Sequence, residues 1–315
     1  MLLSKNMTIS QRQNKPENIK KLQAQRQMYS DIKFWMIFIA IVGVVLPIVV
    51  SFITFAMNND FFSNLLNFEK KDIGYISACI GVITTIYVEL HSNFLKKLKE
   101  DAAKIQEKFD TDVFGLPWDS INVGSKPDTG LILNKSKKFI KKNPNYTGFV
   151  DWYTIKAASF KYPEAIVFCQ QQNLYWDSSL RKDIVIIAKI TLCIIVIMMF
   201  ILGVFNDFTL RSLITNVVLL LLPICLFFYK IITEHNDTIK EMDRLRDIND
   251  DIIEMTISDA SPAVDFLSLC RQLQTAIYNH RKSARPIPNW LHKKRKDDQE
   301  EESADRMQQY LDTHS

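Results

Sequence analysis

The chain has 315 residues, a formal net charge of +4 and 47% hydrophobic residues. So small a net charge gives no indication of nucleic-acid binding by bulk charge, and DNA binding is not expected. The five cysteines are scattered, with no CxxC pair and no accompanying histidine cluster, which argues against a disulfide framework or a zinc site.

The first 33 residues are polar and basic and predict a helix on the cytosolic face of a membrane. Asn14 is followed by Lys15, Pro16 and Glu17, an order typical of a helix start: a capping residue, an early proline, then an acid. The alternative is a disordered basic tail.

The longest uncharged stretch runs over 24 positions from Phe34 to Met57. At about 1.5 Å per residue it reaches about 36 Å, more than the about 30 Å of a hydrocarbon core. A buried helix of a soluble protein rarely stays apolar on every face for that length. The stretch therefore predicts a transmembrane helix, and no cleavage site follows it, so we expect it in the mature protein.

Three further apolar stretches predict spans, at Ile73–Leu90, Ile184–Phe205 and Leu213–Ile232. The links between the first and second spans and between the third and fourth are short. Short links predict two helical hairpins, separated by a long segment.

Amphipathic helices are expected to continue the second span over 92–109 and the fourth over 234–256. A helix on both sides of Pro163 is expected over 151–180, and another over 262–280. The fold class predicted is an all-α membrane protein, with four transmembrane helices as two hairpins with helical cytosolic extensions. The expected parts are a basic N-terminal helix at 1–33, a first hairpin at 34–90, a stalk helix and central module at 91–183, a second hairpin at 184–233, and a stalk helix with a C-terminal helical region and charged tail at 234–315.

Lysines and arginines are concentrated in the N-terminal tail, after the second span, before the third and after the fourth. Because cytoplasmic flanks carry the excess of basic residues, both termini and 91–183 are expected in the cytosol. Lys70 and Lys71 favour the opposite orientation and are outweighed. The predicted location is the bacterial inner membrane, crossed several times.

Four strings of residues carry a resemblance to a known family. They are RQN at Arg12–Asn14, AQRQMYS at Ala24–Ser30, DTDVFGLPW at Asp110–Trp118, and RQLQTAIYNHR at Arg271–Arg281 followed by Pro288, Asn289 and Trp290. In this order, around four apolar stretches, they resemble the SMODS-associating four-transmembrane effectors.

This resemblance implies a role in bacterial anti-phage defence. Such effectors are encoded beside a nucleotidyltransferase that makes cyclic oligonucleotides, and the messenger would trigger membrane disruption and stop the infected cell. The resemblance carries over no catalytic residues.

The sequence contains no phosphate-binding GxxxxGK[ST] loop, no HExxH and no GxSxG. We therefore expect no enzyme, no catalytic or metal site and no cofactor. Asp110 and Asp112 admit two interpretations. They could hold a divalent metal with a phosphate, or they could be a helix-end pair beside buried apolar residues, since two acids alone underfill a metal shell.

Aromatic and arginine side chains of the cytosolic parts are the candidates for ligand binding, because stacking and guanidinium contacts hold a base and its phosphate. They could equally be core residues. The candidates are Trp118, Trp152, Arg181, Arg281, Arg285 and Trp290.

Prolines and polar residues inside the spans are the candidates for gating or lining a pore. The prolines could be hinges or packing bends, the polar groups could line water or join helices, and the lysine could be functional or reach the headgroups. The candidates are Pro47, Ser77, Thr84, Thr85, Lys189, Asn216 and Pro223.

The predicted function is a pore-forming or membrane-disrupting effector activated by a cyclic nucleotide. Four helices of one chain enclose at best a narrow lumen, so a pore implies a homo-oligomer in the bilayer. The alternative is a membrane-anchored sensor or scaffold that conducts nothing. The two differ in whether the polar residues of the spans converge on one lumen.

Overall fold

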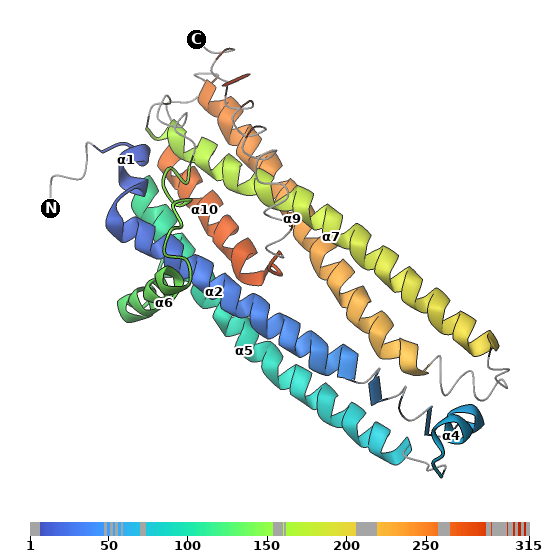
Figure 1. The fold of residues 1–315 in the computed structure, drawn as a ribbon. Coiled ribbons are helices and arrows are strands. Elements are labelled where there is room, and N and C mark those ends of the chain that lie inside the picture. The colour runs from blue at the N-terminus through green and yellow to red at the C-terminus, as the bar shows by residue number, and fades with distance from the viewer. Residues whose placement is uncertain are drawn as a thin grey trace. The chain divides into compact units, whose positions relative to one another are not determined.

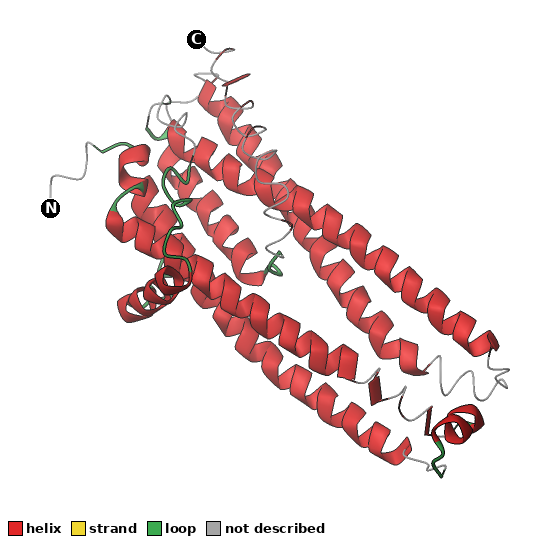
Figure 2. Cartoon of the chain, in the orientation of Figure 1, coloured by secondary structure: helices red, strands yellow, loops and turns green. Residues whose placement is uncertain are grey.

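The computed structural model describes residues 7–46, 49–50, 53, 56–57, 59–69, 74–153, 160, 162–205, 219–257, 265–287 and 291, and the single positions 301, 305, 308, 309 and 312. Every regular element within these residues is a helix (Figure 1, Figure 2), which confirms the predicted all-α class. The helices are α1 (Ile9–Gln13), α2 (Pro16–Ala40), a π-helical turn η1 (Ile41–Val45), α4 (Asp60–Leu66), α5 (Gly74–Phe114), α6 (Thr129–Lys142), α7 (Glu164–Phe205), α9 (Leu219–Ile257) and α10 (Phe266–Ser283).

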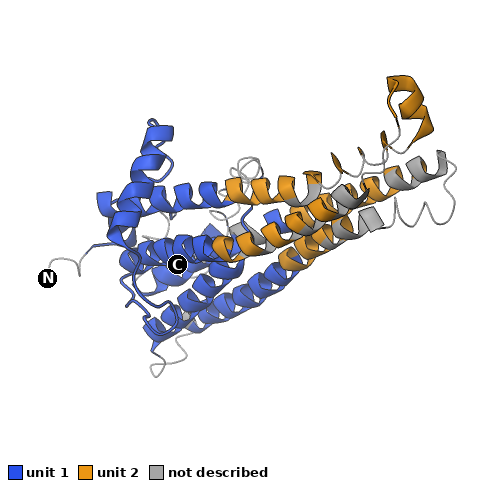
Figure 3. Cartoon of the chain, turned by 90° about the horizontal axis from the view of Figure 1, so that it is seen from below, with its two compact units in different colours: residues 1–32, 96–182, 236–315 blue, residues 33–95, 183–235 orange. Residues whose placement is uncertain are grey.

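The chain divides into two compact units (Figure 3). Unit 1 comprises residues 1–32, 96–182 and 236–315, and unit 2 comprises residues 33–95 and 183–235. The long helices α2, α5, α7 and α9 each contribute residues to both units. The helices predicted to continue the second and fourth spans are present, because α5 and α9 run without a break through 92–109 and 234–256.

Unit 1 has a well-packed apolar core. Phe109 of α5, Leu174 of α7, Leu245 of α9 and Leu273 of α10 belong to one cluster of buried side chains. The apolar faces expected for the two continuing helices pack over most of their length, although Phe94, at the start of the first face, is exposed. The buried members are Ala102, Ile105, Phe109, Met242, Leu245 and Ile252. Burial of side chains of this size supplies most of the stability of such a unit.

The helix ends of unit 1 follow local chemistry. Thr8 caps α1, because its Oγ1 accepts from the Gln11 amide at 3.3 Å while its own amide donates to Gln11 Oε1 at 3.1 Å. Helix α2 begins at Pro16, as predicted. Helix α5 ends at Phe114, and the φ of 74° at the following Gly115 lies in the left-handed region that glycine adopts without strain.

The prediction of a helix before Pro163 is wrong for residues 151–153. Asp151 has a φ of 52°, and its amide donates to Asn14 Oδ1 at 2.9 Å while Asn14 Nδ2 donates to Asp151 Oδ1 at 2.7 Å. These contacts with a residue far away in the chain hold the turn in place of a helix. Helix α7 begins only at Glu164, and residues 154–159 and 161 are outside the described set.

Unit 2 differs from unit 1 in the exposure of its large apolar side chains. Large apolar residues are exposed along its helices, among them Phe34 and Ile37 of α2, Ile83 of α5 and Ile190 of α7. In the described residues, no helix combines the length and the apolarity that crossing a membrane needs. Parts of the predicted spans, including 47–48, 51–52, 54–55 and 206–218, lie outside the described residues.

Candidate functional site

Two buried carboxylates on α5 lie at the centre of a polar network in unit 1. Glu107 and Asp110 are one helical turn apart, and both side chains have no exposed area. Arg271 Nη2 donates to Glu107 Oε1 at 2.5 Å, and Arg281 Nη1 donates to Asp110 Oδ2 at 2.5 Å. Gln274 Nε2 lies between the pairs and donates to both carboxylates, at 2.9 and 3.0 Å. Two arginines of α10 thus neutralise two acids of α5.

The environment of these charges shifts their ionisation. Burial raises the pKa of Glu107, and the positive charge of Arg271 opposes that effect. For Arg281, burial is the largest effect and acts to lower the pKa, but the charge of Asp110, its hydrogen bond and the nearby Tyr153 together raise the pKa above its usual value. Each charge is therefore kept in the interior by its partner, and removing one partner leaves the other uncompensated.

Further contacts extend the network to two other segments. Tyr153 OH donates to Asp110 Oδ1 at 2.6 Å, and Asn173 Nδ2 of α7 donates to Tyr153 OH at 2.9 Å. Burial, together with the charge of Asp110, raises the pKa of Tyr153 well above its usual value. The phenol therefore remains a donor, and the network joins α5, α7 and α10 to the turn at 151–153.

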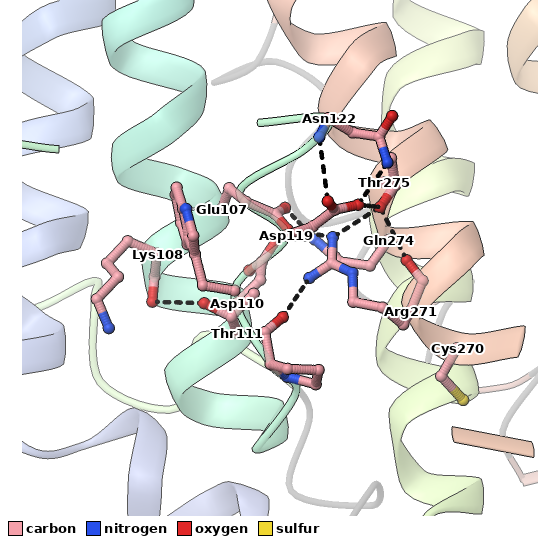
Figure 4. Close-up of polar contacts among 12 residues, drawn as sticks. Glu107, Lys108, Asp110, Thr111, Asp119, Asn122, Cys270, Arg271, Gln274 and Thr275 are labelled. Carbon is pink, nitrogen blue, oxygen red and sulfur yellow. Dashed lines mark hydrogen bonds and ion pairs between the residues drawn. The ribbon is translucent and has the colours of Figure 1, made fainter. Parts of the chain in front are cut away.

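Arg271 also holds the loop that follows α5 (Figure 4). Arg271 Nη1 donates to the Pro117 carbonyl at 3.2 Å, and Nη2 also donates to Thr275 Oγ1 at 3.0 Å. Thr275 Oγ1 in turn donates to Asp119 Oδ2 at 3.1 Å. The network is closed on itself, and it is better suited to locking unit 1 together than to receiving a ligand.

Both aspartates of the Asp110–Asp112 pair are engaged by cationic side chains. Asp110 is enclosed by the network, and Asp112 forms ion pairs with Lys21, at 2.5 Å, and with Lys108. No group of three or more histidine, cysteine or acidic side chains suited to a metal occurs among the residues described. The helix-end interpretation of the pair fits the structure, because both residues lie in the last turns of α5.

The three arginines predicted to bind a ligand form contacts within unit 1. Arg281 is paired with Asp110, and Arg181 is buried, with its Nη1 donating to the Arg285 carbonyl at 2.9 Å. The structure thus brings Arg181 and Arg285 together at the end of α10. The prediction that these residues bind a ligand is not tested by these contacts.

The predicted tryptophans are dispersed. Trp118 Nε1 donates to the Gly124 carbonyl at 2.8 Å, and its ring packs against a small cluster that contains Tyr278. Trp152 packs against the main core of unit 1. Trp290 lies outside the described residues.

The predicted pore residues are only partly described. Thr84 of α5 is buried and Lys189 of α7 is exposed. Ser77 and Thr85 lie in α5 and Pro223 lies in α9, but their side chains are outside the described set, as are Pro47 and Asn216 altogether. The π-helical turn η1 ends at Val45, two residues before Pro47 in the sequence.

An open cavity of about 350 Å³ lies in unit 1 between the junction of α1 with α2 and the end of α5. It is lined by Arg12, Lys15, Glu17, Asn18, Thr111, Asp112, Gly115 and Leu116. A cavity of this size is within the range of small-molecule sites. It is the candidate site of the described part of the chain.

Two of the strings singled out in the sequence meet at this cavity. Arg12 belongs to the string RQN, and Gly115 belongs to the string DTDVFGLPW, about a hundred residues later. The other two members of RQN have structural roles: Gln13 exchanges hydrogen bonds of 2.7 and 3.1 Å with the backbone of Tyr153, and Asn14 holds Asp151. Sequence reasoning missed Arg12 as a site residue, although the string itself was the available signal.

Comparison with known proteins decides the family. The SMODS-associating 4TM effector domain matches residues 7–310. This chain belongs to that family. The family resemblance seen in the sequence is therefore confirmed over nearly the whole chain, which is an effector of the SMODS-associated class. A protein of Bacillus cereus (strain VD146), named a probable CBASS effector molecule, is 25% identical over 297 residues, which cover 92% of this chain and 94% of that protein. No solved structure matches the chain.

Proposed function

We propose that this SMODS-associating effector acts in anti-phage defence by disrupting the inner membrane. A cyclic oligonucleotide made by a partner nucleotidyltransferase binds the cytosolic unit 1 and activates the protein. The hydrophobic unit 2 then permeabilises the bilayer as a homo-oligomer, without enzymatic chemistry. Membership of a family described as 4TM effectors, and similarity to a protein named as a probable CBASS effector, support this proposal.

The observation that carries the membrane part of the proposal is a stripe of exposed aliphatic side chains on α7. Its members recur at helical spacing and are about half exposed: Ile186, Ile190, Ile194, Ile197 and Ile201. Their fifteen-residue separation along the helix corresponds to about 23 Å. Burying one such side chain is worth about 1.5–3 kcal/mol, so five half-exposed ones leave on the order of 5 kcal/mol unrealised in water. Lipid, or a second helix within lipid, recovers that free energy.

The expected orientation places 91–183 and both termini in the cytosol. Unit 1, where the apolar side chains are buried and ion pairs are frequent, has the composition of a water-facing unit. Reporter fusions after Asn59 and after Asn122 should report opposite compartments. Equal signals from both fusions would exclude the four-span arrangement.

A pair of substitutions tests the role of the stripe. Ile194→Asp should lower the fraction of the full chain inserted into membranes, because a carboxylate at the centre of a lipid-facing helix costs about 2.5–3.5 kcal/mol. Ile121→Asp is the matched control, since Ile121 is 93% exposed in a loop of unit 1 and should tolerate the charge. Membrane fractions would be compared after carbonate extraction. If the Ile194 variant is retained as well as the control, the stripe does not face lipid.

The effector function is tested in cells. The chain would be co-expressed with the nucleotidyltransferase of its own gene neighbourhood, and the membrane potential would be followed with a sensitive dye. Loss of the potential before lysis is the expected result, whereas the chain alone or an inactive synthase should leave it intact. If cells stop growing while the potential persists, the alternative of a non-conducting membrane-anchored sensor or scaffold is the better description.

A further inference from the structure

We propose that the cavity lined by Arg12, Lys15 and Gly115 binds a phosphate group of the nucleotide that activates this protein. The proposal rests on the function proposed above, because it assigns the messenger to a place on unit 1. None of the residues predicted from sequence to bind the ligand lines this cavity.

The first argument is an arginine that lacks an acidic partner. Arg12 Nε is buried and has no hydrogen-bond acceptor, and no ion pair to the guanidinium exists among the described residues. Its neighbour is the ring of Tyr162, with Cζ at 5.8 Å from the ring centroid. Burial lowers the pKa of this guanidinium, while Tyr162 acts in the opposite direction. A partly desolvated cation of this kind gains from any anion placed beside it.

The second argument is the charge around the cavity. Arg12 and Lys15 contribute positive charge, and Lys15 has no ion-pair partner in the described structure. Of the two acids at the cavity, Asp112 is already neutralised by Lys21 and Lys108. The N-terminal end of the 25-residue helix α2 adds a partial positive charge at the same place. The second acid, Glu17, offsets one of the two cations, so a net positive charge remains at the cavity and favours an anion.

The third argument is the shape that Gly115 allows. A Cβ atom at this position would lie 2.6 Å from Arg12 Nη1, and the φ of 74° is unfavourable for any other residue. The glycine therefore leaves room for the guanidinium at the end of α5. The Arg12 backbone is fixed separately, since its carbonyl accepts from Asn18 Nδ2 at 2.7 Å. A planar guanidinium on a fixed backbone is suited to bidentate contact with phosphate oxygens.

The size and openness of the cavity point to a nucleotide in place of a bare ion. About 350 Å³ is far more than a water or a single phosphate requires. Asn18, beside the cations, is held at both ends of its amide, because Lys21 Nζ donates to its Oδ1 at 2.7 Å and its Nδ2 donates to the Arg12 carbonyl. Phosphate contacts would then fix the ligand, with its remaining atoms directed toward the open side.

The test is calorimetric titration of the full-length protein in detergent micelles. The probes are cyclic di-AMP, cyclic GMP–AMP, cyclic tri-AMP and sodium phosphate. Arg12→Gln should weaken the binding of the cyclic nucleotide by about tenfold or more, because hydrogen bonds to charged groups are lost. Lys15→Gln should weaken it by about two- to fivefold. Lys20→Gln is the matched control, since Lys20 is exposed on α2 and does not line the cavity, and should bind as the wild type does.

Equal affinity of the wild type and both cavity variants would overturn the proposal, as would the absence of binding by every probe. Misfolding is tested by Lys15→Gln, because no described residue depends on that side chain, and by the circular dichroism of each variant. The depolarisation assay separates the two claims. If cavity variants depolarise cells as the wild type does, the site is wrong and the function stands. If the wild type binds through Arg12 but does not depolarise cells, the function is wrong and the site stands.

Discussion

Replacing Arg271 with methionine is expected to destabilise unit 1 by about 3–5 kcal/mol near neutral pH. The Glu107 side chain has no exposed area and that of Arg271 is only 12% exposed, and their 2.5 Å contact is the main charge compensation of Glu107. Without the guanidinium, the carboxylate keeps only the hydrogen bond from Gln274. The cost is dominated by the buried charge left behind, more than by the contact that is lost.

The pH dependence follows from the raised pKa of Glu107. Burial raises this pKa, and loss of Arg271 removes an opposing effect and raises it further. A folded-state pKa above the unfolded value means that the folded protein binds the proton more tightly, so the stability of the variant increases as the pH falls through that pKa. The penalty should therefore be largest near neutral pH and should shrink as the pH is lowered toward the ordinary pKa of glutamic acid, 4.5.

The assay is urea unfolding followed by tryptophan fluorescence, with a matched exposed ion pair as control. Arg244 Nη2 lies 2.6 Å from Glu241 Oε1, but the side chains are 56% and 41% exposed. Arg244→Met should therefore cost less than about 1 kcal/mol. The double variant Glu107→Gln/Arg271→Met should regain most of the loss. A penalty for Arg271→Met no larger than the control, or one that persists unchanged in acid, would refute the reasoning.

Three further results are expected. Asp31→Asn should release α6, because Lys135 and Lys138 are bound to Asp31 at 2.7 and 2.8 Å, and faster amide exchange confined to α6 would be the measured sign. Leu245→Ala should lower the free energy of unfolding by about 2–5 kcal/mol, since the side chain is fully buried; a loss below about 1 kcal/mol in urea unfolding would contradict the core described here. Insertion of a Gly-Ser pair after Ser92 or after Lys230 interrupts α5 or α9. It should abolish toxicity to the cell, while ligand binding, measured by calorimetry, is retained. Toxicity at wild-type level in both variants would show that these helices do not transmit the effect of ligand binding to the membrane.

The parts of the fold that depend on residues close together in the chain could be predicted from the sequence. The amphipathic helix over 92–109 could be predicted because a helix places every third or fourth residue on one side, and Ile105 and Phe109 of that side are buried. The start of α2 at Pro16 depends on neighbouring residues alone, and was predicted for the same reason. The family could be recognised because four short strings of residues occur in a fixed order around the four apolar stretches.

Contacts across long distances in the chain could not be predicted in this way. The turn at Asp151 depends on Asn14, 137 residues away, and this tertiary contact overrides the local helical preference. Glu107 and Arg271 are separated by 164 residues, so nothing near either residue indicates the ion pair. Arg12 was visible as part of a string, but its lack of an acidic partner appears only once α5 is placed beside it.

The most direct test of the central claim uses purified protein in liposomes that contain a self-quenching dye. The product of the partner nucleotidyltransferase would be added outside, with protein oriented so that unit 1 is accessible. The account predicts dye release that requires both the protein and the nucleotide, and that needs about tenfold more nucleotide in Arg12→Gln but not in Lys20→Gln. Intact liposomes under conditions in which the nucleotide demonstrably binds the wild-type protein would contradict the account.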